Sequence, residues 1–333
     1  MLRVVDAARA VARDRASLMD DLVATTGLSG EGVELGFRHL ELSPTDAELD
    51  ALVAGAGDAK HVVVILSSNV FVAALRAVAI ARAASPAVIV RPSRREPHFA
   101  RALVEHAGDV GISLATDVDL AHLFGGEVHV YGRDATIADV RARVGERIRV
   151  RGHGAGMGVA LVTESASLSI AAASLAQDVV PFDQRGCLSP RIALVLGDAA
   201  RAVRFGASLD EALARAAERV PRGTVHPDER AEATRYESTM AFAGTVFARS
   251  THVVGVAPAG GALVVPPAGR HVHVAAAGDL DAARALLESV AQVVVAVGAD
   301  DPERAASVAP AHARVSQLGA MQRPRFDGPV DRR

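Results

Sequence analysis

The chain has 333 residues, half of them hydrophobic, and a formal net charge of −3. It can therefore bury a large core, and it lacks the basic excess that would indicate nucleic acid as a partner. Its single cysteine excludes an internal disulfide, and the N-terminus has no signal-peptide core, so we expect a cytoplasmic protein. The longest apolar run, residues 61–84, contains Arg76 and Arg82, which argues against a membrane span.

The first half of the chain is expected to begin with helices and to continue as alternating strands and helices. Residues 2–24 carry apolar side chains at helical spacing, and two further helices are expected through about residue 54. The segments that follow are HVVVIL (61–66, strand), NVFVAALRAVAIARAA (69–84, helix), PAVIVRPS (86–93, strand), EPHFARALVEHA (96–107, helix), GEVHVYG (126–132, strand), TIADVRARVG (136–145, helix) and RIRVRG (147–152, strand). Such alternation predicts a parallel sheet with right-handed crossovers.

The pattern changes after Gly152, which predicts a second α/β domain. Its expected segments are VALVTESASLSIAAASLAQD (159–178, strand then helix), RIALVLG (191–197, strand), a long helix near 198–218, an exposed helix opened by PRGTVHPDERAEATRYE (221–237), the strands THVVGV (251–256), GALVV (261–265) and RHVHVAA (270–276), DLDAARALLESV (279–290, helix) and AQVVVAVG (291–298, strand). We expect a dinucleotide-binding domain with N-terminal helices over 1–155, a catalytic domain over 156–310 and a C-terminal tail over 311–333, whose stretch LGAMQRPRFDGPVDRR (318–333) is irregular and basic.

The only cysteine, Cys187, lies in a polar turn. It follows Gly186 and precedes Ser189-Pro190-Arg191, which leads into an apolar strand. These neighbours favour a nucleophilic thiol, whose thiolate form would be helped by Arg185 and Arg191 or by a helix N-terminus. The alternative is a buried core cysteine, since cysteine is among the residues most often found inside proteins.

Two strand ends carry polar side chains that suit ligand binding. Asn69 follows the first buried strand and is either the N-cap of the next helix or an amide that stabilises an oxyanion. Arg91, Ser93 and Arg94 follow the next strand, at the same edge of a parallel sheet. They form either a solvated basic turn or a site for an anionic cofactor, whose phosphate an arginine can hold.

The glycine-rich stretch RGHGAGMGVALV (151–162) is not a dinucleotide fingerprint, because it leads into a strand and not into a helix. We interpret it as a domain crossover with His153 exposed in it, either as an acid or base near neutral pH or as a polar linker residue. His271 and His273 share one strand face, but no third ligand is evident and no HExxH motif exists. No metal site is expected.

Taken in order, these segments resemble the aldehyde dehydrogenase superfamily, and more specifically its fatty-acyl-CoA reductase branch, the type found in bacterial luminescence. The turn FDQRGCLSPR and the tail GAMQRPRFDGPVD carry the more specific similarity. The resemblance implies an aldehyde-dehydrogenase-like α/β fold, with a Rossmann-like parallel-sheet cofactor domain and a second α/β catalytic domain. It implies Cys187 as nucleophile and Asn69 as oxyanion donor. His153 takes the place of the water-activating glutamate of hydrolytic members, which favours transfer between CoA and enzyme.

The same resemblance implies a nicotinamide cofactor. Arg91 and Ser93 correspond to the Lys-Pro-Ser strand end that binds the adenosine ribose, and Gly132 to a glycine over the pyrophosphate. Arg133 replaces the serine after that glycine, and Ser67 at the first strand end joins the cofactor residues. The extra arginines favour NADPH, with NADH as the alternative.

The function implied is the NADPH-dependent reduction of an acyl-CoA thioester to an aldehyde through a cysteine acyl-enzyme, with His153 in proton transfer. The alternatives are an acyl-phosphate reductase, an acylating aldehyde dehydrogenase working in the other direction, and a catalytically inactive binding or assembly subunit of the same fold. The expected partners are the acyl-CoA substrate and either further copies of the chain or a biosynthetic complex, with no nucleic acid and no membrane span.

Overall fold

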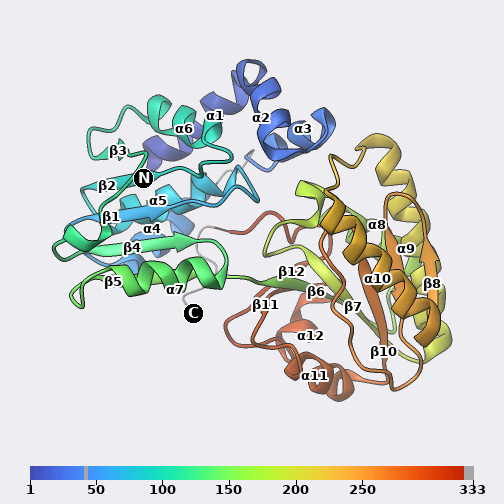
Figure 1. Cartoon of the computed structure of the whole chain (residues 1–333). Coiled ribbons are helices and arrows are strands. Elements are labelled where there is room, and N and C mark those ends of the chain that lie inside the picture. The colour runs from blue at the N-terminus through green and yellow to red at the C-terminus, as the bar shows by residue number, and fades with distance from the viewer. Residues whose placement is uncertain (41–43, 326–333) are drawn as a thin grey trace. The chain divides into compact units, whose positions relative to one another are not determined.

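The computed structural model describes residues 1–40 and 44–325, and they form two compact units (Figure 1). The first unit comprises Met1–Ala155 and the second Gly156–Pro324. Arg325, the last described residue, belongs with the first unit, where its backbone oxygen accepts a hydrogen bond from Arg76 Nη1 at 2.7 Å. No helix within the described residues is both long and apolar enough to cross a bilayer.

The first unit opens with short helices: α1 (Leu2–Arg13), the 3₁₀ turn η1 (Arg15–Leu18), α2 (Met19–Thr26), α3 (Gly30–Arg38) and α4 (Asp46–Ala56). The helical spacing over residues 2–24 is thus divided between two helices, because α1 ends at Asp14 and a 3₁₀ turn follows. Two of these helices, α3 and α4, begin with N-cap residues of the types that favour helix starts. Ser29 Oγ accepts the N–H of Gly32, and Thr45 and Glu48 form a capping box at the start of α4.

The sheet of the first unit is entirely parallel, in the order β3-β2-β1-β4-β5. Its strands are β1 (Val62–Ile65), β2 (Val88–Arg91), β3 (Ile112–Leu114), β4 (Glu127–Tyr131) and β5 (Arg149–His153), and its connections contain α5 (Ala73–Ala84), α6 (His98–Ala107), η2 (Leu120–His122) and α7 (Asp134–Arg143). This strand order is that of a Rossmann-like domain, which binds its ligand at the carboxyl ends of the strands.

Each face of this sheet is covered by apolar side chains. Ile137 and Val140 of α7 pack on one face, against the β1 and β4 residues Val63, Ile65, Val128 and Val130. Helix α5 contacts β1 and β2, and near its start Phe71 packs edge to face with Phe37 of α3 and Phe99 of α6, with ring centroids 5.3 to 6.2 Å apart. Burial on both faces explains why β1 is the continuous β-branched run VVVI.

The second unit contains a seven-stranded sheet in the order β12-β11-β6-β7-β10-β9-β8, antiparallel only between β8 and β9. Its elements are β6 (Met157–Val162), α8 (Leu168–Val179), η3 (Pro181–Gln184), β7 (Pro190–Leu196), α9 (Ala199–Arg219), α10 (Pro227–Ala243), β8 (Thr245–Ala248), β9 (Val253–Val256), β10 (Val272–Ala277), α11 (Leu280–Glu288), β11 (Val294–Ala299), α12 (Pro302–Ala306) and β12 (Arg314–Gln317). Helices α8 and α9 pack together, and α11 and α12 lie on the other side of the sheet (Figure 1).

Two segments of the second unit differ from the sequence prediction. Residues 261–265 form no strand, and β9 already pairs with β8 and β10 on its two sides. The partly buried side chains of Leu263 and Val264 pack against two different apolar clusters instead. Arg314–Gln317, in the C-terminal tail for which no strand was predicted, is the edge strand β12, whereas residues 326–333 lie outside the described residues. The sequence analysis did not predict three short strands, β3, β8 and β12.

Candidate active site

The candidate cofactor residues of the first unit gather at the carboxyl edge of its sheet. Ser67 follows β1, and Arg91 is the last residue of β2. The backbone oxygen of Arg91 accepts the N–H of Leu66 at 3.0 Å. This hydrogen bond extends the β1–β2 pairing beyond the strand end and so holds the Ser67 and Arg91 segments side by side. Ser93 continues from β2, and its Oγ accepts the N–H of Arg95 at 3.2 Å.

Asn69 is exposed and does not cap α5. The helix begins at Ala73 with Val72 as N-cap, so the N-cap interpretation of Asn69 is wrong. The physical reason is the extra turn at residues 70–72, which separates the asparagine from the helix. Its side-chain amide makes no hydrogen bond with another described residue.

Arg91 differs from the other arginines of this segment in its burial. It is half-buried, and its Nε is buried without a hydrogen-bond partner among the described residues. A buried donor of this kind normally finds an acceptor. Arg94 and Arg95, three and four residues along, are exposed, in contrast to Arg91.

Gly132, Arg133 and His153 complete this edge. The N–H of Gly132 donates to the His153 backbone oxygen at 3.1 Å, and exposed Arg133 is the N-cap residue of α7. His153 is not the exposed crossover residue expected from the glycine-rich stretch. It ends strand β5, is half-buried, and stacks on Tyr131 with ring centroids 4.1 Å apart, because parallel pairing brings both rings to one face.

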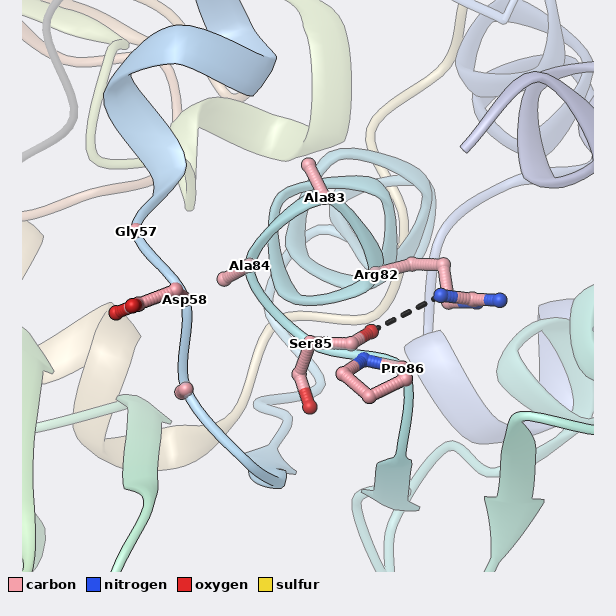
Figure 2. A pocket seen from close by; sticks show the side chains of 8 residues that line it. Gly57, Asp58, Arg82, Ala83, Ala84, Ser85 and Pro86 are labelled. Carbon is pink, nitrogen blue, oxygen red and sulfur yellow. Dashed lines mark hydrogen bonds between the residues drawn. The ribbon is translucent and has the colours of Figure 1, made fainter.

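A pocket of about 320 Å³ lies at the opposite, amino-terminal edge of the same sheet (Figure 2). Its lining comes from residues 57–59 before β1 and residues 82–86 before β2. Arg82 donates hydrogen bonds there to the Ser85 backbone oxygen at 3.0 Å and to the Asp109 carboxylate at 2.9 Å. The Asp58 carboxylate points away from α5. This pocket contains none of the candidate residues.

In the second unit, Cys187 is exposed at the tip of a turn whose other residues are largely buried. The alternative of a buried core cysteine is therefore wrong. The turn is closed by a hydrogen bond from the Ser189 N–H to the Gly186 oxygen at 3.1 Å. Arg185 donates to the Thr224 oxygen at 3.1 Å, and Arg191 is largely buried, which lowers its pKa. Cysteine side chains are usually buried in proteins, whereas the Cys187 thiol is exposed on a turn of mostly buried residues.

The frame of this turn is a run of three left-handed residues. Phe182, Asp183 and Gln184 have φ of 56°, 50° and 62°, and all three are buried. Non-glycine residues rarely adopt this conformation, and a run of three persists only where surrounding contacts hold it. The backbone of η3 is therefore fixed by its side chains.

Asp183 and Gln184 supply those contacts. Asp183 Oδ1 accepts from Arg270 Nε at 2.9 Å, and its Oδ2 accepts from the N–H of Gly223 at 3.0 Å. The Gln184 amide donates to the backbone oxygens of Pro190 at 2.7 Å and His271 at 2.8 Å, and its Oε1 accepts the His271 N–H at 2.9 Å. These hydrogen bonds connect the cysteine turn to Pro190 at the start of β7 and to His271 just before β10.

A second buried carboxylate, Asp178 at the end of α8, holds the segment after β12. Its oxygens accept the N–H groups of Gly319 at 2.6 Å and Met321 at 2.9 Å, and burial raises its pKa to about 7. The next residue, Gln322, donates from Nε2 to Ser189 Oγ at 3.3 Å, two residues after Cys187. The sequence analysis did not identify four residues that hold the turn: Asp178, Asp183, Gln184 and Arg270. The signal that could have found them is a polar residue within an otherwise buried stretch.

The paired histidines at the start of β10, His271 just before the strand and His273 within it, are buried. Burial lowers the pKa of His271 to about 3 and that of His273 to about 4. Within the part of the chain that the structure describes, no three His, Cys, Asp or Glu side chains converge as metal ligands.

Comparison with known proteins places these features in a family. The model of the family "Acyl-CoA reductase (LuxC)" matches residues 54–331, most of the chain. No curated protein sequence matches significantly.

Several solved structures share the fold. An NAD-dependent benzaldehyde dehydrogenase from Corynebacterium glutamicum superposes with a TM-score of 0.67 at 17% identity, covering 92% of this chain and 77% of that one. An acetylating aldehyde dehydrogenase from Geobacillus thermoglucosidasius gives 0.66 at 15% identity, covering 96% and 82%. The HpcC protein from Thermus thermophilus gives 0.66 at 16% identity, covering 96% and 72%. The fold is therefore that of the aldehyde dehydrogenases.

Proposed function

The chain belongs to the acyl-CoA reductase (LuxC) family, an oxidoreductase family, and from this premise we propose that it reduces an acyl-CoA to an aldehyde through an acyl-enzyme on Cys187. The observation that carries the proposal is the exposed thiol held at the tip of a strained, buried turn. A nucleophile must be accessible and fixed in orientation, and this turn supplies both properties.

In the first step, Cys187 Sγ would bond to the thioester carbonyl carbon as the carbon–sulfur bond to CoA breaks and CoA leaves as a thiol. We assign stabilisation of the carbonyl oxygen to the Asn69 amide together with the Cys187 backbone N–H, following the family resemblance. His153 is assigned to proton transfer. Release of the aldehyde regenerates the Cys187 thiol.

The cofactor is proposed to be NADPH, with NADH as the alternative; when bound, the reduced nicotinamide supplies the hydride. The carboxyl edge of the first sheet fits this group, because Arg91 has a buried Nε donor without an acceptor among the described residues and Gly132 precedes the N-terminus of α7. Ser67, Ser93 and Arg133 are assigned to the same site. Arg91 and Arg133 favour the additional phosphate of NADPH.

The test is mass spectrometry of the intact protein after mixing with acyl-CoAs of graded chain length, without reductant. A mass increase equal to the acyl group, absent in Cys187→Ala and discharged as aldehyde on adding NADPH, is expected. The absence of an adduct with every acyl-CoA, from folded protein whose thiol still reacts with iodoacetamide, would overturn the proposal. Adducts from acyl phosphates alone would instead identify an acyl-phosphate reductase.

A further inference from the structure

Arg222, Gly269 and His271 form a small polar group in the second unit, which we call the Arg222 notch. Gly269 has φ of 112°, and a Cβ at this position would clash with Nη2 of Arg222 and lie 3.4 Å from Nε2 of His271. The two nitrogen atoms therefore lie against the same side of one glycine. Only glycine leaves room for the Arg222 guanidinium to pack here.

Both nitrogens are donors that lack an acceptor among the described residues. His271 Nδ1 accepts the N–H of Val253 at 3.0 Å, so in the neutral ring the proton sits on Nε2. This Nε2 is buried and has no hydrogen-bond partner there, and His271 is only 2% exposed. Arg222 is half-buried and likewise makes no hydrogen bond with the described residues. The buried Nε2–H of His271 is thus an unsatisfied donor, and the cationic Arg222 beside it suits an oxyanion as the missing acceptor.

The surrounding charge also favours an anion. Arg185 and Arg270 lie near Arg222, whereas its neighbouring carboxylates are Asp183 and Glu229. Three guanidinium groups thus face two carboxylates. Asp183 is occupied by Arg270 and Gly223, and Glu229 accepts the N–H of His226 at 3.1 Å. Burial and the neighbouring Arg270 and Arg185 lower the pKa of Arg222, whereas Asp183 and Glu229 act in the opposite direction.

The Arg222 notch adjoins the cysteine turn. The N–H of Gly223 donates to Asp183, and Arg185 donates to the oxygen of Thr224, so residues 222–224 run beside residues 183–185. An anion bound by Arg222 would therefore lie beside the segment that directly precedes Cys187. We propose that the Arg222 notch binds a phosphate group of the acyl donor; this inference rests on the proposed acylation of Cys187. Coenzyme A and an acyl phosphate both carry such a group.

The experiment compares the rate of Cys187 acylation, followed by intact mass, for octanoyl-CoA, octanoyl phosphate and the phosphate-free S-octanoyl-pantetheine. Arg222→Gln is expected to slow acylation by a phosphorylated donor about 10- to 100-fold, the range for one charged hydrogen-bonding group. The pantetheine thioester should react unchanged. Arg222→Lys should fall between, and Arg230→Gln, at an exposed arginine in α10, should match the unmodified protein.

A loss confined to octanoyl-CoA identifies the CoA phosphates as the ligand, and a loss confined to octanoyl phosphate identifies the acyl phosphate. An equal loss with all three donors would overturn the proposal in favour of a structural role, and so would no loss with either phosphorylated donor. If the unmodified protein forms no adduct, the proposed function fails instead. Calorimetry with inorganic pyrophosphate then still tests the notch: weaker binding to Arg222→Gln supports it, and equal or absent binding refutes it.

Discussion

Asp183 and Arg270 form an ion pair with Nη2 and Oδ1 2.7 Å apart and neither side chain more than 3% exposed. The pair lies at the base of the turn that presents Cys187, and Arg270 also donates to the Val220 oxygen at 2.7 Å. A buried pair of this kind adds little net stability, but removing one partner leaves the other charge without compensation.

Replacing the acid should therefore be costly. Asp183→Asn is expected to lower the free energy of unfolding by about 3 to 5 kcal/mol, because the Arg270 guanidinium stays buried. Urea denaturation followed by circular dichroism measures the loss. Asp281→Asn, in an exposed pair with Arg284, is the control and should change little. Equal stability of the two variants would contradict the assigned role of the pair.

Gln184 should matter for the reaction more than for simple thiol chemistry. In Gln184→Leu the backbone groups of Pro190 and His271 lose their partners, at about 1 to 3 kcal/mol for each buried group left unsatisfied. With its turn loosened, Cys187 should lose most of its acylation rate with acyl-CoA. Alkylation by iodoacetamide, which needs only an accessible thiol, should fall by less. The exposed Gln177→Leu serves as control; parallel changes in both reactions would argue against a positioning role.

Asp178 should make stability fall as the pH rises. Its pKa of about 7 in the folded protein exceeds the value near 3.9 of an unfolded aspartate, so the folded state holds the extra proton between these limits. The contribution is complete below about pH 4 and is lost towards pH 7, at up to about 1.4 kcal/mol per pH unit. The stability difference between the unmodified protein and Asp178→Asn, measured by urea denaturation from pH 5 to 8, should follow this slope. A pH-independent difference would refute it.

His273 should act in the opposite direction. Burial lowers its pKa to about 4, so the unfolded chain takes up a proton near pH 6.5 that the folded protein does not. Its contribution is present above pH 6.5 and is lost as the pH falls towards 4, again at up to about 1.4 kcal/mol per unit. His273→Gln should reduce this acid sensitivity in thermal or urea unfolding, whereas the exposed His122→Gln should not. Unchanged sensitivity in His273→Gln would show that the ring is protonated when folded.

Arg91 should discriminate between cofactors. Arg91→Ala is expected to weaken NADPH binding about 10-fold or more while NADH binding changes little, because a guanidinium–phosphate contact is lost. Titration of cofactor fluorescence gives both constants, and the exposed Arg94→Ala is the matched control. Equal weakening of the two cofactors would remove Arg91 from phosphate recognition.

The sequence by itself determined the alternation of strands and helices and the two-part α/β architecture, and it favoured a nucleophilic over a buried cysteine, which the exposure of Cys187 bears out as far as burial goes. β-branched runs such as residues 62–65 identify buried parallel strands, and local turn residues around Cys187 indicate an accessible thiol. The family resemblance followed from the same local signals, and the family match confirms it.

Only the tertiary structure decided which polar residues hold that turn. Asp183 meets Arg270, and Gln184 meets His271, across 87 positions of sequence in each case. The structure also places His153 on strand β5, where a loop was expected, and it contains no strand at residues 261–265, where one was expected. Spacing along the chain reports neighbours within an element, whereas these contacts depend on how distant strands are ordered in the sheet, and no local pattern encodes that order.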